Sequence, residues 1–469
     1  MVYVNGFPEM VISAPPIEIN AQFKKALEVM ENTAKNVFIT GKAGTGKSTL
    51  LGYFRNITTK KIVVLAPTGV AALNVKGETI HSFFRFKPDI TFEKIKKLKG
   101  KRARIYQEID TIVIDEISMV RADLLDCVDR FLRLNADDAK KPFGGLQMVF
   151  IGDLYQLPPV ITAKEKPLFT SRYPSAYFFD ADVFKELSLE FIELDKVYRQ
   201  KDEAFIRILN AIRNNSVTDE DLGILNSRLN AGFAAKGKSS YTVYLCPTNK
   251  IASEINQRQL DTLKTKVYVF AAKIEGDFKE YAYPTENIMH LGIGAQVMLL
   301  NNDAKGRWVN GSLGKISDIQ YDDEKENEAV FVRLAGGNIE KVLPFTWEIF
   351  HFSFNEGTHA IETEMLGSFT QYPLKLAWAI TIHKSQGKTF DRVIIDMDKG
   401  AFAHGQTYVA LSRCTSLEGI TLKRPIKKSD IFMDWRIVRF MTSYQYSLSE
   451  RDMPFEEKVE VIQEAIKPT

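Results

Sequence analysis

The sequence predicts an α/β fold built on two parallel-sheet units. From residue 36 to about residue 200, short apolar runs alternate with helical segments, and this rhythm is typical of a parallel sheet with helices on both faces. The expected strands of this first unit are 36–40, 61–66, 111–115, 147–152 and 190–195. The same rhythm returns in the second half of the chain, at the apolar runs 241–246 and 392–396.

The second unit is interrupted by a segment with a different pattern. Between about 295 and 372, short strands such as 329–334 and 339–343 are separated by turn residues at 322–325 and 336–338. Turn residues between short strands at this spacing are typical of β-hairpins. We therefore expect a small β-barrel inserted into the second unit.

Length and composition set the broad class of the protein. With 469 residues the chain is too long for a single core, and its net charge of +3 means that any affinity for nucleic acid must come from local patches. The three cysteines, Cys127, Cys246 and Cys414, lie far apart and suit a reducing interior. No apolar run approaches the ~20 residues that span a bilayer, and no signal segment is evident. These features predict a cytoplasmic protein without membrane contact.

A glycine-rich segment between an apolar run and a helical run predicts a nucleoside triphosphate site. Gly41 to Ser48 fits the phosphate-loop pattern of Gly, four residues, then Gly-Lys-Ser, and Val37–Thr40 before it is a strand candidate. Glycines let backbone N–H groups face the phosphates, and the following helix adds partial positive charge. Lys47 is placed to reach the β- and γ-phosphates and Ser48 to bind Mg²⁺. The expected nucleotide contacts are Gly41, Ala43, Gly44, Thr45, Gly46, Lys47, Ser48 and Thr49.

Two carboxylates at the end of the predicted buried strand 111–114 favour hydrolysis of that triphosphate. Asp115 and Glu116 directly follow the run 111–114. Asp115 would hold Mg²⁺ and Glu116 would polarise the attacking water. Gln156, in the stiff segment after the strand 147–152, is placed to face the γ-phosphate. Arg199 and Arg413 could stabilise the transferred phosphoryl group if the second unit closes over the first.

Two other features leave their interpretation open. Seven Lys and Arg residues lie within Lys94–Arg104, a segment without acids whose apolar residues would share one face of a helix. This basic helix is either a solvated face or a contact for a phosphate backbone. Phe83, Phe84 and Phe86 could stack on bases or form part of the core.

Taken in order, these segments resemble the motif series of superfamily-one helicases that move 5′ to 3′. Within this branch, Met119–Gln147 is similar to the signature of the petite-integration-frequency (PIF) helicase family, with Asp123-Leu124-Leu125, Arg130 and Pro142–Gln147. The resemblance covers roughly residues 17 to 424. The motifs that carry it are Gly41–Ser48, Ala66–Ala72, Thr79–Phe83, Asp115-Glu116, Gly152–Val160, Tyr198–Gln200, Thr381–Gly387 and Tyr408–Cys414.

The resemblance implies a role for each matched position. Lys47, Ser48, Asp115 and Glu116 would bind and hydrolyse ATP with Mg²⁺, and Gln156 would sense the γ-phosphate. Arg199 and Arg413 would act as arginine fingers. Gln22 would read the adenine, and Gly387 would lie at the nucleotide. The implied contacts with single-stranded DNA are Pro67, Thr68, Gly69, His81, Ser82, Phe83, His383, Lys384 and Ser385.

The resemblance also implies a domain plan of two RecA-like motor domains. The first would span residues 1–200 with a small wedge insertion at about 77–104. The second would comprise 201–310 and 372–430, separated by an SH3-like β-barrel at 311–371. Residues 431–469 would form a helical tail.

The implied protein is a monomeric ATP-dependent DNA helicase of 5′-to-3′ polarity. Its partners would be single-stranded DNA, tailed or forked duplexes and G-quadruplex DNA, in replication, repair, recombination or telomere-type maintenance. It would be associated with the nucleoid in a bacterium. Three alternatives stay open at this point: a translocase that strips proteins from DNA, a nucleotide-gated switch, and an RNA helicase.

Overall fold

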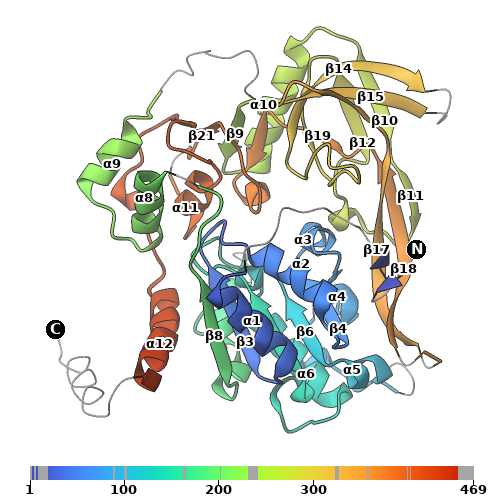
Figure 1. Cartoon of the computed structure of the whole chain (residues 1–469), viewed down its shortest axis with the longest axis vertical. Coiled ribbons are helices and arrows are strands. Elements are labelled where there is room, and N and C mark those ends of the chain that lie inside the picture. The colour runs from blue at the N-terminus through green and yellow to red at the C-terminus, as the bar shows by residue number, and fades with distance from the viewer. Residues whose placement is uncertain are drawn as a thin grey trace.

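The computed structural model describes residues 3–4, 7–8 and 19–452, except 88–89, 100–102, 162–164, 201, 231–240, 323–326, 356, 359, 399 and 402. Two parallel sheets form the cores of two α/β domains, and antiparallel strands extend from the second (Figure 1). The prediction of a two-unit α/β fold is therefore confirmed. Within the described part of the chain, no helix has the length and apolar character required to cross a membrane.

The first domain contains a six-stranded parallel sheet in the order β5-β4-β6-β7-β3-β8. Its strands are β3 (Asn36–Gly41), β4 (Ile62–Ala66), β5 (Glu78–Thr79), β6 (Thr111–Ile114), β7 (Gln147–Ile151) and β8 (Leu189–Leu194). Its helices are α1 (Ala21–Asn32), α2 (Lys47–Ile57), α3 (Gly69–Asn74), α4 (Ile80–Phe83), α5 (Arg104–Glu108), α6 (Ala122–Asn135) and α7 (Lys166–Thr170). Two short strands near the N-terminus, β1 (Tyr3–Val4) and β2 (Phe7–Pro8), pair with each other.

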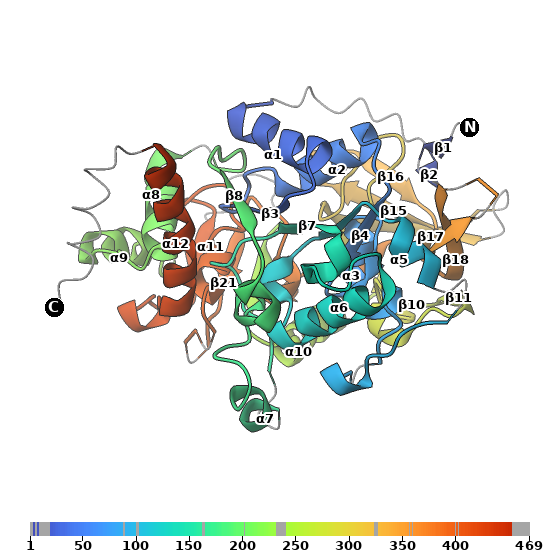
Figure 2. The same cartoon turned by 90° about the horizontal axis from the view of Figure 1, so that it is seen from below.

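Alternation along the strands divides the first domain into two apolar layers. Val37 and Ile39 of β3 belong to the core formed with α1 and α2, whereas Phe38 points into the core formed with α6. Successive side chains of a strand point to opposite faces, so a buried central strand needs apolar residues at every position. Figure 2 shows α1 and α2 on one side of this sheet and α6 on the other.

The second domain contains a four-stranded parallel sheet in the order β20-β9-β21-β22. Its strands are β9 (Val243–Cys246), β20 (Ala379–Thr381), β21 (Val393–Ile395) and β22 (Ile420–Leu422), and its helices are α8 (Glu203–Arg213), α9 (Asp219–Asn226), α10 (Asn249–Thr262) and α11 (Gln406–Leu411). The short 3₁₀ helices of the two domains are Phe92–Lys94, Ile117–Met119, Pro142–Gly145, Phe178–Asp180, Asp182–Lys185, His383–Ser385 and Lys428–Asp430.

The β insertion between β9 and β20 is larger than the expected span of 311–371, which is a correction to the domain plan. It runs from β10 to β19, because β13 pairs with both β14 and β19 in one five-stranded sheet. Its strands are β10 (Val267–Ala271), β11 (Lys273–Gly276), β12 (Ile288–Gly292), β13 (Gln296–Leu299), β14 (Leu313–Asp322), β15 (Asn327–Leu334), β16 (Ile339–Val342), β17 (Phe345–Asn355), β18 (Ala360–Gln371) and β19 (Leu374–Leu376), with a 3₁₀ turn at Glu280–Ala282. These strands form three antiparallel sheets, and the SH3-like barrel stays a prediction.

Two elements from the second half of the chain return to the first domain. The hairpin of β17 and β18 reaches β5, where the backbone N–H of Phe352 donates to Glu78 Oε2 at 3.2 Å. The C-terminal helix α12 (Trp435–Asp452) lies beside β8 in Figure 1, and its Phe440 stacks on Phe179 with ring centroids 4.3 Å apart. The helix expected over 455–466 falls outside the described residues.

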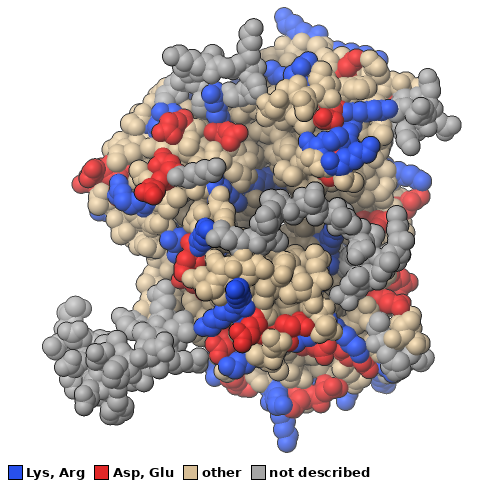
Figure 3. Space-filling view, viewed as in Figure 1, with Lys and Arg blue, Asp and Glu red and all other residues tan. Residues whose placement is uncertain are grey.

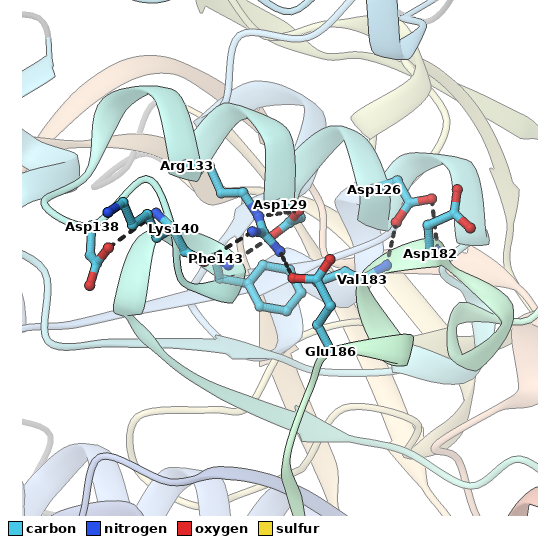
Figure 4. A network of polar contacts seen from close by, with 9 residues as sticks. All are labelled: Asp126, Asp129, Arg133, Asp138, Lys140, Phe143, Asp182, Val183 and Glu186. Carbon is cyan, nitrogen blue, oxygen red and sulfur yellow. Dashed lines mark hydrogen bonds and ion pairs between the residues drawn. The ribbon is translucent and has the colours of Figure 1, made fainter.

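Buried aspartates on α6 organise the signature segment (Figure 4). Asp129 accepts the backbone N–H of Phe143 at 2.6 Å and the Arg133 guanidinium at 2.8 Å, and so fixes a turn in which Phe143 has a φ of 53°. Asp126 accepts the backbone N–H groups of Asp182 and Val183, each at 3.0 Å. The signature therefore has a structural role in holding two loops on α6.

Replacing Asp129 with alanine should lower the apparent melting temperature of the protein. The substitution leaves the buried N–H of Phe143 without its acceptor, which costs about 1–3 kcal/mol. Asp137→Ala removes an exposed carboxylate two residues beyond the end of α6 and serves as the matched control, with an expected effect within about 0.5 kcal/mol. Thermal melts of the two variants should differ. Equal melting temperatures would contradict a structural role for Asp129.

Candidate nucleotide and DNA sites

The loop between β3 and α2 has the backbone of a phosphate cradle. Gly41, Gly44 and Gly46 have φ values of 154°, 84° and 88°. A Cβ atom at Gly44 would lie 2.5 Å from the Cβ atom of Arg199, so only glycine fits this close approach. Helix α2 begins at Lys47, and Gly46 before it offers no side chain to cap the first N–H groups. These N–H groups are therefore oriented to receive an anion.

Lys47 lies at the centre of this loop. Its Nζ donates to the carbonyl of Gly41 at 2.6 Å and to that of Lys42 at 3.1 Å. Burial lowers the pKa of Lys47, whereas the carboxylates of Asp153, Glu116 and Asp115 oppose this shift. The lysine thus faces both the loop and the acidic groups, which is the position a phosphate-binding cation requires.

The acidic pair lies next to this lysine. Asp115 follows β6, and Glu116 has a left-handed backbone with a φ of 50°. Burial and the neighbouring Glu116 raise the pKa of Asp115 to about 7, and burial also raises the pKa of Glu116. Two adjacent carboxylates in a desolvated site are destabilised unless a cation offsets their charge. The donor set therefore fits a hard divalent cation such as Mg²⁺, which Asp115 and the Ser48 hydroxyl would hold.

Gln156 connects the acidic side of the site to the second domain. Its Nε2 donates to Asp153 Oδ2 at 3.1 Å, and its Oε1 accepts Nε2 of Gln386 at 3.5 Å. Gln386 directly follows the 3₁₀ turn after β20 and precedes Gly387, whose φ is 74°. This arrangement brings the segment of Gly387 close to Gln156.

The two predicted arginine fingers also converge on this site. Arg199 lies against Gly44 and donates to the carbonyl of Ser412 at 3.3 Å. Arg413 is 1% exposed and donates to the carbonyls of Val409 and Ser385. Burial and the charge of Arg199 lower the pKa of Arg413 to about 9, and Glu116 opposes that shift. The arginine therefore lies within electrostatic range of the acidic pair.

The structure places the remaining predicted nucleotide contacts around the same loop. Ser48 and Thr49 are exposed on the first turn of α2, and Thr45 Oγ1 donates to the carbonyl of Lys42 at 2.9 Å. Gln22 lies in the first turn of α1 and donates to Asp195 Oδ2 at 2.8 Å. The ring of Phe23, the next residue, lies near Gly46, so the start of α1 lies beside the phosphate loop.

Sequence reasoning missed residues that complete the nucleotide site. The Tyr408 hydroxyl accepts the backbone N–H of Ala43 at 3.0 Å, which joins α11 of the second domain to the phosphate loop. The motifs quoted above already contain Tyr408, Asp153 and Gln386. The sequence therefore offered a sign of the functional importance of these three positions. Arg213, near Asp153, lies in no motif.

The predicted DNA contacts divide into accessible and inaccessible groups. Thr68 and Lys384 are exposed, and His81 and His383 are half-buried, with burial lowering the pKa of both histidines. Pro67, directly before Thr68, is half-buried. The Ser82 hydroxyl donates to Glu78 Oε1 at 2.6 Å. Gly69 packs against the β insertion, since a Cβ atom there would lie 2.9 Å from Ala282.

Two predicted DNA contacts are corrected by the structure. Phe83 is 0% exposed and packs edge-on against Phe84 and Tyr106, so its ring belongs to the core and cannot stack on bases. Phe84 and Phe86 are buried in the same cluster. The hydroxyl of Ser385 is also buried and donates to the carbonyl of Ile382 at 2.6 Å. The backbone of α4 directs the Phe83 side chain into the core, and the 3₁₀ turn His383–Ser385 does the same for Ser385. Neither side chain can contact DNA there, although an aromatic ring can stack on bases and a hydroxyl can bind phosphate.

Further cations lie beside the segment His383–Ser385. Burial and the charges of Lys388 and Lys384 lower the pKa of Lys375 to about 7. Burial lowers the pKa of Lys388 to about 8, and its Nζ donates to Asn310 Oδ1 at 2.8 Å. On the face seen in Figure 3, basic and acidic side chains are interspersed.

The basic run is not the expected amphipathic helix. A 3₁₀ turn ends at Lys94, residues 95–99 have no regular secondary structure, and α5 begins only at Arg104. Ile95 is buried, and the N–H of Leu98 donates to Asn135 Oδ1 on α6 at 2.6 Å. Packing on α6 therefore holds this segment in a non-helical form, with Lys96, Lys97 and Lys99 exposed.

Replacing Lys96, Lys97 and Lys99 with alanine should flatten the salt dependence of binding to tailed duplexes. Each lost phosphate contact reduces the slope of log affinity against log salt by about 0.7–0.9. Titrations at several salt concentrations measure this slope. The control replaces Lys24, Lys25 and Lys140, which are equally exposed, and should leave the slope unchanged. Equal slopes in the wild type, the triple variant and the control would show that these lysines do not contact DNA.

Comparisons with known proteins identify the family of this chain. The model of the family described as PIF1-like helicase matches residues 18–223. The ATP-dependent DNA helicase Pif1 of Bdellovibrio bacteriovorus is 30% identical over 440 residues, covering 92% of this chain and 93% of the relative. Human ATP-dependent DNA helicase PIF1 is 34% identical over 396 residues, covering 82% of this chain and 58% of the human protein.

Solved structures of a bacterial relative have the same fold. Unliganded Pif1 from Bacteroides sp. is 36% identical with a TM-score of 0.82, covering 92% of this chain and 98% of that one. The Bacteroides Pif1 complex with ADP-AlF3 and single-stranded DNA is 35% identical with a TM-score of 0.67 at the same coverage. The Bacteroides Pif1 complex with ADP-AlF4 has a TM-score of 0.83. The present arrangement of domains is thus more similar to the unliganded and ADP-AlF4 structures than to the complex with single-stranded DNA.

Proposed function

Because the chain belongs to the family of PIF1-like helicases, we propose that this ATP-dependent DNA helicase moves 5′ to 3′ along single-stranded DNA and unwinds tailed or forked duplexes. The observation that carries the proposal is a nucleotide site shared between two domains. Lys47, Asp115 and Glu116 come from the first domain, whereas Tyr408 and Arg413 come from the second, and Arg199 lies in the connection between the domains.

In the proposed reaction, residues of the first domain bind the triphosphate and activate the attacking water. Lys47 and the N–H groups of the loop bind the phosphates. Ser48 and Asp115 would hold Mg²⁺, which would offset phosphate charge when bound. Glu116 accepts a proton from the attacking water, and Gln156 orients that water against the γ-phosphate. Arg199 and Arg413 stabilise negative charge that develops on the transferred phosphoryl group.

In this proposal, ATP hydrolysis is coupled to movement along DNA through both domains. Each domain contains a predicted strand-contact segment, with Thr68 and His81 in the first and His383 and Lys384 in the second. The domains would close when ATP binds and open after hydrolysis. The two segments would then bind the DNA strand in turn. Contacts to phosphate are independent of sequence, as movement along DNA requires. Structures of Bacteroides Pif1 contain single-stranded DNA, and another describes unwinding of forked duplex DNA by two such helicases.

We further propose that the protein acts as a monomer and also unwinds G-quadruplex DNA, in replication, repair, recombination or telomere-type maintenance. These finer assignments rest on the family resemblance of the motif series. Exposed Thr68 and Lys384 suit contact with any single strand, whether its downstream partner is a duplex or a quadruplex.

A strand-displacement assay tests the polarity. Duplexes with a 5′ single-stranded tail should be separated in the presence of ATP and Mg²⁺, and duplexes with a 3′ tail should not. Separation of only the 3′-tailed substrate would overturn the proposed polarity. DNA-stimulated hydrolysis without separation of either substrate would instead assign the chain as a translocase that displaces proteins.

A further inference from the structure

A buried arginine lies between the two domains, beside the nucleotide site. Arg213 is the last residue of α8, whose apolar face packs in the core of the second domain. Its side chain is 6% exposed, and the guanidinium lies over the ring of Tyr155 with 3.9 Å to the centroid. Nη2 of Arg213 lies 3.7 Å from Asp153 Oδ1 and 3.5 Å from Glu193 Oε1. The three partners all belong to the first domain.

Asp153 links this arginine to Gln156. The Asp153 side chain is 0% exposed, and its Oδ2 accepts the Gln156 amide at 3.1 Å, while its Oδ1 accepts the backbone N–H of Tyr155 at 3.2 Å. One carboxylate therefore contacts both the arginine of α8 and the glutamine expected to face the γ-phosphate. The charge of Arg213 also acts on Lys47, which places it within electrostatic range of the phosphate loop.

The chemistry of this contact favours arginine over other cations. A planar guanidinium can stack on Tyr155 and reach two carboxylates at once, which an ammonium group cannot do in the same geometry. Within the described residues, the buried Nε of Arg213 has no hydrogen-bond partner. A buried ion pair with one unsatisfied N–H is poor evidence for stability alone, because desolvation offsets the attraction of its charges.

We propose that Arg213 is a positioning residue that couples movement of the second domain to γ-phosphate sensing, by orienting Gln156 through Asp153. When α8 moves with its domain, the pull on Asp153 changes the direction of the Gln156 amide. The inference rests on the proposed function, because the role of Gln156 is part of it. It assigns to α8 a part in transmitting the DNA-bound state to the nucleotide.

The test is a double-mutant cycle on the full chain, measured as ATP hydrolysis with a single-stranded oligonucleotide. Arg213→Gln should lower the DNA-stimulated kcat by about tenfold or more, a loss of about 1.4 kcal/mol or more of transition-state stabilisation, with a KM for ATP within about twofold of wild type, since uniform substrate binding is retained. Gln156→Ala should also lower kcat. If Arg213 acts through Gln156, the double variant should be no slower than Gln156→Ala alone. Additive losses, or a normal kcat in Arg213→Gln, would overturn the inference.

Two further variants distinguish a positioning role of Arg213 from a general effect of substitutions on α8 and from loss of the folded protein. Arg207→Gln, on the same helix, removes an exposed arginine paired with Asp221 and should leave kcat and KM unchanged. If Arg213→Gln melts too early to assay, Arg213→Lys keeps the positive charge but loses the planar fork, and the same cycle applies to it. A wild-type protein without DNA stimulation would contradict the proposed function itself. Normal stimulation in every Arg213 variant would contradict only this inference.

Discussion

Lys47→Ala is expected to abolish ATP hydrolysis and DNA unwinding while leaving part of the binding to single-stranded DNA. The ammonium group lies at the centre of the phosphate loop, 2.6 Å from the carbonyl of Gly41. Its loss removes the main fixed positive charge facing the β- and γ-phosphates, and removal of one preorganised group of this kind costs about 10²–10³ in turnover. DNA binding should persist in part, because Thr68 and Lys384 lie on other segments.

Hydrolysis, strand displacement and fluorescence anisotropy with a labelled oligonucleotide measure the three activities separately. Lys42→Ala is the matched control, since it removes another lysine from the same loop, one without a hydrogen bond from its side chain among the described contacts. The control should hydrolyse ATP at close to the wild-type rate. A Lys47→Ala protein that still turns over ATP at that rate would contradict the assignment of the phosphate loop.

Glu116→Gln should lower the hydrolysis rate by about 10² or more, the range expected when a general base is lost. The substitution keeps size and hydrogen bonding but removes the charge that accepts the proton. Burial raises the pKa of Glu116, and the charges of Lys47 and Arg413 oppose this shift and favour the ionised form needed for a base. The affinity for ATP should change little, since the phosphate loop is intact.

Single-turnover hydrolysis and binding of a fluorescent ATP analogue separate these two effects. Glu28→Gln, an exposed glutamate on α1, is the control and should match the wild type in both measurements. Turnover near the wild-type rate in Glu116→Gln would show that another group activates the water. A large loss of ATP affinity would instead show that Glu116 contributes to binding.

The two sheets could be predicted from sequence because their strands are buried on both faces. Val37, Phe38 and Ile39 are all apolar, since two separate cores lie on either side of β3. The phosphate loop and the acidic pair were predictable for a related reason. Their function depends on backbone conformations and charges that only a few residue types provide, such as the left-handed φ of Gly44 and Gly46.

Features that depend on long-range packing could not be predicted in the same way. The β insertion begins well before residue 311 because β11 pairs with β18 and β13 pairs with β19, and local patterns do not reveal pairing over such sequence distances. Phe83 has the chemistry to stack on a base, yet its position on α4 directs it into the core. Arg213 lies on an amphipathic helix, and only the approach of Asp153 from the other domain gives it a role.

The central claim is that one nucleotide site, shared between two domains, drives movement on DNA. The most direct test measures ATP hydrolysis by the wild-type protein with and without a single-stranded oligonucleotide. The account predicts slow hydrolysis alone and strong stimulation by the oligonucleotide, because DNA lying across both domains brings Arg199 and Arg413 toward the phosphates. Equal rates under the two conditions would contradict it and would favour a nucleotide-gated switch.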